Sequence, residues 1–238
     1  MFAQRANLAL NRKDFERSQA LAEHVSATES KESWLAYIGF NQTRTLIKEG
    51  QLEQAEKSLS SHLNPELRAA LYSWIASAWL KRGEGVQADR LVSAATAEAV
   101  KIDQPELRAK TYIFLANGIA SADASRAFRL ADSAMGDINA SKDFDPKGSH
   151  LTIETRSTSG AVGSSTYSSS DGLLSLITLL AKADLNRALR LGWSLGPTEA
   201  RAFTLLSACR GALSANQRGT VNTPTPEKKV DKKVEQKK

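Results

Sequence analysis

The chain has 238 residues, of which 32 are basic and 26 are acidic, and its formal net charge is +6. No segment approaches the roughly 20 apolar residues that span a bilayer, and residues 1–16 lack the apolar stretch and cleavage site of a secretory signal. These features predict a cytoplasmic protein without a membrane span.

Four helices are predicted ahead of residue 64. Apolar residues at helical spacing favour a short hairpin of residues 2–10 and 15–25, followed by a second hairpin of residues 30–47 and 52–63. Gly50 is expected to form the turn of the second hairpin, because glycine commonly follows the end of a helix.

The pentapeptide Pro-Glu-Leu-Arg-Ala occurs at residues 65–69 and again, 40 residues later, at residues 105–109. A fixed period of this size indicates stacked structural repeats. Asn64 is a suitable N-cap for the helix that the first copy opens, and proline fits the first turn of both helices. Each copy therefore opens a predicted helical hairpin, the first ending near Ile102 and the second near Ala134.

A fifth hairpin is predicted from residues 173–181 and 185–195. Pro197 then opens a last helix that carries Leu206 and Leu213, and no second helix follows it. This last helix is expected to lack the partner that the other helices have. The expected total is about eleven helices.

The two repeat hairpins resemble the tetratricopeptide repeat (TPR), a helix-turn-helix unit of about 34 residues. The residues at the family's positions are Tyr72, Ile75, Ala76, Trp79, Ala88, Val92 and Ala95 in one copy, and Tyr112, Leu115, Ala116, Ala127, Ala131 and Ala134 in the next. The longer period, and Val100 in place of the family's proline, leave HEAT-like hairpins as the competing assignment. The resemblance implies an all-α fold over residues 1–215. This fold is a right-handed α-α superhelix (solenoid) of about five helical hairpins plus a terminal helix.

Two segments fall outside the repeat. Residues 142–170 are rich in serine and glycine, which predicts a small irregular insertion that is mobile around Gly160. Within it, residues 151–156 are able to pair with residues 166–167 as a small hairpin. Residues 216–238 are predicted to be a disordered basic tail, which carries most of the net charge and leaves the preceding chain nearly balanced.

No catalytic or metal-binding pattern is visible. The three histidines, His24, His62 and His150, lie in separate predicted elements, and no zinc, di-iron or phosphate-loop spacing occurs. Cys209 is the single cysteine and lies between the two leucines of the last helix, which predicts a buried core residue rather than a nucleophile. We therefore expect a protein that is not an enzyme and that binds neither a cofactor nor a metal.

One arginine recurs with the repeat. Arg68 and Arg108 occupy the same position of the pentapeptide, and Arg201 follows a similar Glu-Ala sequence. Such a row of guanidinium groups is able to bind an acidic peptide or phosphates. The favoured interpretation is that each arginine pairs with an acidic residue of the adjacent helix and covers apolar surface with its stem.

In the TPR family the first helix of each hairpin lines the concave face. Carried onto this sequence, that face presents Tyr37, Arg44, Lys48, Ser73, Ser77, Lys81, Lys110 and Asn117. The set is polar and more positive than negative, which suits an extended acidic segment or a C-terminal carboxylate. The family's asparagine-rich carboxylate clamp is not reproduced, and a solvated face without a ligand is the alternative.

These observations predict a non-catalytic, TPR-like scaffold that binds another protein or peptide through its concave face, whose charge suits an acidic partner. A nucleic-acid-binding solenoid that uses the basic tail is an alternative, although the balanced body disfavours it. A second alternative is that the chain is a fragment of a larger protein whose activity lies elsewhere. The sequence indicates no partner by name and no oligomeric state.

Overall fold

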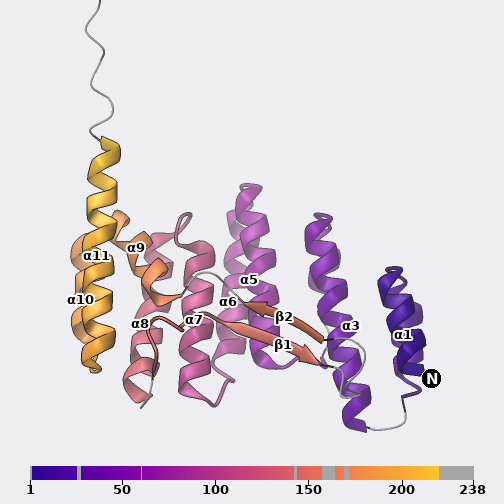
Figure 1. Ribbon diagram of the computed structural model, residues 1–238. Coiled ribbons are helices and arrows are strands. Elements are labelled where there is room, and N and C mark those ends of the chain that lie inside the picture. The colour runs from indigo at the N-terminus through magenta and orange to yellow at the C-terminus, as the bar shows by residue number, and fades with distance from the viewer. Residues whose placement is uncertain are drawn as a thin grey trace, which may run out of the picture.

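The computed structural model describes residues 2–25, 28–59, 61–141, 144–156, 164–168 and 172–219. Within these ranges the chain forms eleven α-helices and one two-stranded antiparallel sheet. The number of helices agrees with the expectation. Neighbouring helices pack in pairs along a single row that runs from α1 at one end to α11 at the other (Figure 1).

The first half of the row consists of α1 (Phe2–Asn11), α2 (Phe15–Ala22), α3 (Thr28–Lys48), α4 (Leu52–Lys57), α5 (Pro65–Lys81) and α6 (Gly85–Ala99). The second half consists of α7 (Pro105–Ile119), α8 (Ala124–Ala140), α9 (Leu173–Ala183), α10 (Leu185–Ser194) and α11 (Thr198–Gly219). Strands β1 (Thr152–Arg156) and β2 (Ser164–Ser168) lie between α8 and α9 in the chain. All five predicted helical hairpins are therefore present.

Short polar residues set the starts of the helices. Asn64 accepts a hydrogen bond at 3.0 Å from the backbone N–H three residues on, and Pro65 occupies the first turn of α5, as expected. The second helices of three hairpins begin after an aspartate, because Asp14, Asp123 and Asp184 each accept the corresponding bond. These caps satisfy backbone donors at the tight turns where the chain reverses direction.

Glycine ends two of the first helices. Gly50 after α3 and Gly83 after α5 have φ angles of 74° and 82°, a left-handed conformation that other residues adopt only with strain. The guanidinium group of Arg82 donates a hydrogen bond to the Gly50 carbonyl at 2.5 Å. The turns of two successive hairpins are thus tied to each other.

The core combines large apolar side chains with many small ones between the helices. Fully buried alanines include Ala69, Ala70, Ala76, Ala95, Ala99, Ala109, Ala116, Ala127, Ala131 and Ala134. One continuous apolar cluster extends from Phe40 in α3 to Ala208 in α11. A separate, smaller cluster joins the first hairpin to α3 through residues such as Leu10, Ala22 and Trp34.

The last helix does have a packing partner, contrary to the expectation. Helix α11 lies along α9 and also contacts α10. A Cβ atom added at Gly211 would lie only 2.5 Å from the backbone oxygen of Thr178 in α9, so the two helices approach unusually closely. The three helices α9, α10 and α11 therefore form a terminal unit of their own.

This close approach reverses the predicted orientation of α11. The helix turns Ala200, Ala208 and Gly211 inward, because only small residues fit against α9. Leu206 and Leu213 are consequently 58% and 64% exposed. Cys209 is also exposed, so the prediction that it is a buried core residue is wrong.

The insertion is more ordered than expected where it leaves α8. Phe144 and Leu151 are buried in the main apolar cluster. The buried Ser149 hydroxyl accepts a hydrogen bond from the backbone N–H of Leu173, which attaches the insertion to the start of α9. The predicted small hairpin is present, with Ile153 opposite Tyr167 in an antiparallel register.

Two predictions concern residues that the structure does not describe. The expected mobility around Gly160 falls between β1 and β2, outside the described residues. The expected disorder of the basic tail lies mostly beyond residue 219, where the description ends. Helix α11 itself continues to Gly219, a few residues into the segment assigned to the tail.

Candidate functional site

The first helices of three successive hairpins, α3, α5 and α7, lie side by side and form one surface, here called the first-helix face. Each contributes one aromatic ring to a continuous row. The ring centroids of Phe40 and Trp74 are 6.0 Å apart, and those of Trp74 and Phe114 are 6.2 Å apart. Both separations are typical of favourable aromatic pairs.

The row follows the repeat. Trp74 and Phe114 stand 40 residues apart, the same spacing as the two copies of the pentapeptide. Phe40 and Trp74 stand 34 residues apart, which is the length of a TPR unit. The row therefore places one ring at an equivalent position in each of three hairpins. The 40-residue spacing of Trp74 and Phe114 is the sequence signal that predicts this row.

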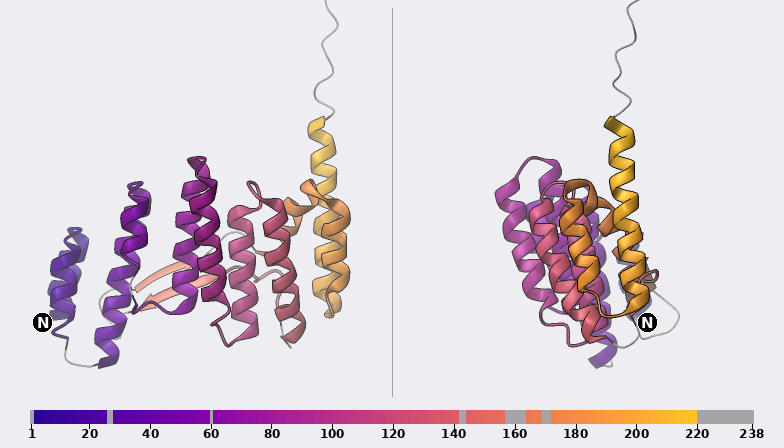
Figure 2. Two further views of the ribbon diagram at one scale, coloured as in Figure 1. Left: turned by 180° about the vertical axis from the view of Figure 1, so that it is seen from behind. Right: turned by 90° about the vertical axis from the view of Figure 1, so that its left-hand side faces the viewer.

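The chain's own β-hairpin crosses this face. In Figure 1 the two strands pass in front of α5 and α7 toward α3, and in the reverse view of Figure 2 they lie on the far side of these helices. Strand β1 contacts α3, although more than one hundred residues of chain separate the two elements. The insertion thus returns along the row and spans several hairpins.

Two of the predicted site residues meet the insertion and its junction with α9. The side-chain amide of Asn117 donates a hydrogen bond at 3.3 Å to the carbonyl of Gly172, which precedes α9. The backbone N–H groups of Lys147 and Gly148 lower the pKa of the Asp145 carboxyl, and the positive charge of Lys110 lowers it further. Phe114 lies on the same stripe of α7 as these two residues, so this end of the aromatic row shares the side of α7 that meets Gly172.

The other predicted site residues are distributed unevenly. Tyr37 and Ser73 are buried, at 8% and 3% exposure, and Tyr37 belongs to the small cluster around Trp34. Arg44 and Ser77 are half-buried. Lys48 and Lys81 are exposed near the ends of α3 and α5. The resemblance to the TPR family placed all eight on one concave face, but their burial differs from buried to exposed, so they do not form one continuous exposed surface.

The recurring arginines pair within the fold. Arg108 binds the Asp137 carboxylate through two nitrogens at 2.6 and 2.9 Å, and donates a third bond at 2.6 Å to the Ile102 carbonyl. This pairing raises the pKa of the Arg108 guanidinium. Arg68 lies 3.5 Å from Glu98 at the equivalent position of the preceding hairpin. The predicted pairing of these two arginines with an acidic residue of the adjacent helix is confirmed, and each pair joins the two helices of its own hairpin.

Arg201, the third arginine of this group, donates to a backbone carbonyl instead of an acidic side chain. Its Nε atom binds the Leu195 oxygen at 2.8 Å. Arg108 makes the same type of contact with a carbonyl six residues earlier, at Ile102. In both places the arginine satisfies a backbone acceptor just before the proline that opens a helix.

The second helices α4, α6, α8 and α10 form the opposite surface, here called the second-helix face. Ion pairs connect each of these helices to the next: Glu56 with Arg90 at 2.5 Å, Asp89 with Arg126 at 2.5 Å, and Asp132 with Arg187 at 3.6 Å. The hydrogen bonds from Arg90 lower the pKa of Glu56. Successive hairpins are therefore joined by aromatic rings on one face and by arginine–carboxylate pairs on the other.

Among the described residues, no group of three or more histidine, cysteine, aspartate and glutamate side chains is arranged to hold a metal ion. The ring of His24 stacks against Phe2, with centroids 5.3 Å apart. None of the helices within the described ranges is both long enough and apolar enough to cross a membrane.

Comparisons with known proteins do not assign the chain to a group. No family model matches it, and neither the curated proteins nor the solved structures contain a match.

Proposed function

We propose that this protein is a non-catalytic, TPR-like helical scaffold that binds an extended polypeptide segment along its first-helix face. The observation that supports the proposal most is the row of rings on α3, α5 and α7. The β-hairpin of the same chain passes in front of these helices in Figure 1 and contacts α3. A surface that accommodates one extended segment has the shape and the apolar contacts to accept another.

The hairpin that covers the face is a weak structure by itself. Its two strands have five residues each, and isolated two-stranded hairpins are marginally stable in water. The hairpin therefore depends on the helices beneath it. A partner segment that matches the face better is able to displace it, which makes the insertion an internal competitor for the binding site.

The charges around the row favour an acidic partner. Lys48 and Lys81 are exposed at the ends of two first helices, and Arg44 on α3 is half-buried. Lys110 already pairs with Glu106 and contributes to stabilising the Asp145 carboxylate. The face thus holds one carboxylate of the insertion near a lysine, and an acidic segment would meet the same type of contact.

The arrangement of the helices supports a solenoid. Five hairpins stack in chain order, each contacting the next, and alanines separate the helices as in close-packed repeat arrays. The Phe40–Trp74 spacing equals a TPR unit and the Trp74–Phe114 spacing is longer. We therefore propose a TPR-like array in which the second repeat has additional residues, with a right-handed superhelical path.

The decisive experiment supplies the hairpin in trans. Residues 152–168 are replaced by a short glycine-serine linker, and a fluorescent peptide with the sequence of residues 150–170 is titrated into the shortened protein. Binding is measured by anisotropy. We expect saturable binding to the shortened protein and binding at least about tenfold weaker to the intact chain, where the covalent hairpin competes.

A matched pair of tryptophan variants identifies the surface. Trp74→Ala in the shortened protein is expected to weaken peptide binding, because it removes the central ring of the row. Trp193→Ala serves as the control, since Trp193 is 64% exposed on α10, near the α11 end of the line of helices. Failure of a folded, shortened protein to bind the peptide would contradict the proposal.

A further inference from the structure

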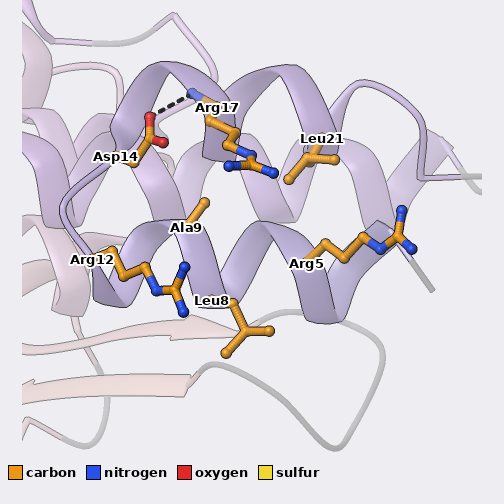
Figure 3. A pocket seen from close by; sticks show the side chains of 7 residues that line it. All are labelled: Arg5, Leu8, Ala9, Arg12, Asp14, Arg17 and Leu21. Atoms are coloured by element: carbon orange, nitrogen blue, oxygen red, sulfur yellow. Dashed lines mark hydrogen bonds between the residues drawn. The ribbon is translucent and has the colours of Figure 1, made fainter.

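The first hairpin has two different sides. Its inner side packs against α3, where Leu10 and Ala22 join the cluster around Trp34. Its outer side faces away from the row, at the end marked by the N-terminus in Figure 1. A cavity of about 270 Å³ opens between the two helices, and its lining residues are Arg5, Leu8, Ala9, Arg12, Asp14, Arg17 and Leu21 (Figure 3).

Three arginines surround the apolar centre of this cavity. Arg5 and Arg12 extend from α1 on either side of Leu8, and Arg17 extends from α2 (Figure 3). Leu8 is 58% exposed. The outer side of the hairpin therefore combines an open apolar centre with a rim of positive charge.

The guanidinium groups of these arginines meet no carboxylate within the described part of the chain. The nearest acidic residue in the cavity, Asp14, is already engaged as the N-cap of α2 and accepts the backbone N–H of Arg17 at 3.2 Å. The three arginines thus have no salt-bridge partner among the described residues at this surface, and the single carboxylate of Asp14 leaves the cavity with an excess of positive charge.

Elsewhere in the row, arginines between neighbouring hairpins do have acidic partners. Arg90, Arg126 and Arg187 each bind a carboxylate on the adjacent second helix. The outer side of the first hairpin offers the same donors and apolar residues, but no further helix lies against it within the described residues. Its residues are of the kind found between neighbouring hairpins, but no described helix there supplies the matching carboxylates and apolar side chains.

We propose that the outer side of the first hairpin docks an acidic amphipathic helix of a partner protein. Leu8 and Leu21 contact apolar side chains of the partner, and Arg5, Arg12 and Arg17 bind its carboxylates. Residues three, four and seven apart lie on the same side of a helix, so Arg5, Leu8 and Arg12 form one stripe. The stripe extends over about 10 Å of helix length. Carboxylates flanking a leucine at the same spacing on the partner helix match this stripe.

The apolar centre favours a helix over a nucleic acid. A phosphate backbone offers charge for the arginines but no apolar group for Leu8 and the cavity between α1 and α2. A leucine side chain of a partner helix removes both from water, at roughly 25 cal/mol per Å² of apolar surface. This second surface is separate from the first-helix face, so its partner is independent of the proposed function.

The test uses the full chain and two synthetic helical peptides of about 20 residues, a length at which isolated helices become stable enough to study. In one peptide, leucines spaced three and four residues apart form one face of the helix, and glutamates flank that face. The other peptide has glutamine in place of every glutamate. Affinity is measured by fluorescence anisotropy. We expect the glutamate peptide to bind at least about tenfold more tightly, with an affinity that falls as salt is raised.

The variants locate the site on the first hairpin. Arg5→Glu, Arg12→Glu and Arg17→Glu are combined in one protein, and the control combines Arg129→Glu, Arg190→Glu and Arg210→Glu, which change the net charge equally at exposed positions. The first protein is expected to lose binding of the glutamate peptide and the control to retain it. Leu8→Ser is expected to weaken binding about tenfold without altering the circular dichroism spectrum.

Three results would overturn the proposal. One is equal affinity for the glutamate and glutamine peptides, and another is an equal loss of binding in both triple variants. The third is arginine-dependent binding to duplex DNA or to phosphatidylserine vesicles by a protein that binds neither peptide, which assigns the surface to a polyanion. Trp74→Ala should leave the binding unchanged, so a failure here is distinguishable from a failure of the first-helix face.

Discussion

The two repeated hairpins, α5–α6 and α7–α8, and the terminal unit, α9–α11, stack helices in different ways. The repeated hairpins use alanine between the helices and an arginine–carboxylate pair within each hairpin. The terminal unit has three helices and depends on Gly192 and Gly211, where a Cβ atom would lie 2.8 Å from Leu205 and 2.5 Å from the Thr178 backbone. Repeated units therefore depend on interactions that recur, and the end of the row depends on a contact made once.

The difference explains where sequence patterns predict packing. A contact that recurs in each repeat places the same residue at a fixed interval in the sequence. Arg68 and Arg108 show this interval, because both belong to the repeated pentapeptide. The contact between α9 and α11 joins segments about 30 residues apart and occurs once, so it leaves no period to detect. Four predictions test this contrast, from the largest expected effect to the smallest.

Gly211→Ala is expected to break the terminal unit. The added methyl group meets the backbone oxygen of Thr178, which cannot move aside as a flexible side chain does, and overpacking of this kind costs about 2–3 kcal/mol of unfolding free energy. Urea unfolding monitored by circular dichroism measures the loss. Gly136→Ala in α8 is the control, because nothing lies near its added Cβ and alanine favours the helix. Equal effects of the two changes would show that α11 is not held closely against α9.

Arg108→Ala is expected to destabilise the protein more than Arg68→Ala. Removing Arg108 deprives the half-buried Asp137 carboxylate of two charged donors and the Ile102 carbonyl of a third bond, a loss of about 2 kcal/mol. Removing Arg68 costs about 1 kcal/mol, because Glu98 retains the bond from Lys101 at 2.8 Å. The same urea titrations compare them. A larger loss for Arg68→Ala would mean that the two pairs do not contribute as their geometries indicate.

The N-caps of the two repeated hairpins differ and provide a third test. Asn64→Ala removes the side-chain cap of α5 and is expected to cost about 1 kcal/mol. Gln104 stands at the equivalent position of α7 without a side-chain cap bond, so Gln104→Asn is expected to stabilise the protein by up to about 1 kcal/mol. Thermal unfolding of both variants measures the shift. No gain for Gln104→Asn would show that the extended backbone before α7 does not orient a short side chain toward the helix.

The smallest expected effect concerns pH and the pairs between hairpins. Arg90 lowers the pKa of Glu56 in the folded protein, so the pair stabilises the fold above the unfolded pKa of glutamate and this stabilisation is lost as pH falls through the lowered folded pKa. Arg90 is exposed, which limits the contribution to below about 1 kcal/mol. Unfolding free energies of the original protein and Glu56→Gln are expected to differ near pH ~7 and to converge near pH ~3. A constant difference across this range would exclude the ion pair as its cause.

Local signals predicted most of the helices. The hairpins, the Asn64 cap, the turn at Gly50 and the small strand pairing all follow from residues close together in the chain. The candidate site was predicted less completely. Asn117 does bind the Gly172 carbonyl just after the insertion, and the charge of Lys110 acts on Asp145 within it, but Tyr37 and Ser73 are buried. Helical spacing gives the side of a helix on which a residue lies, and the tilt of each helix decides what that side contacts.

The sequence by itself determined the helical hairpins, their order and the recurrence of arginine, because each depends on hydrogen bonds and apolar contacts within one or two helices. Tertiary structure alone decided the path of the insertion back to α3 and the side of α11 that faces α9. Alanine and glycine occupy the inner side of α11, and its leucines are exposed. For the helix taken alone, burying leucine would lower the free energy more than burying alanine or glycine. How closely two helix backbones approach depends on the side chains of both helices together, so the sequence of one helix is not sufficient to predict it.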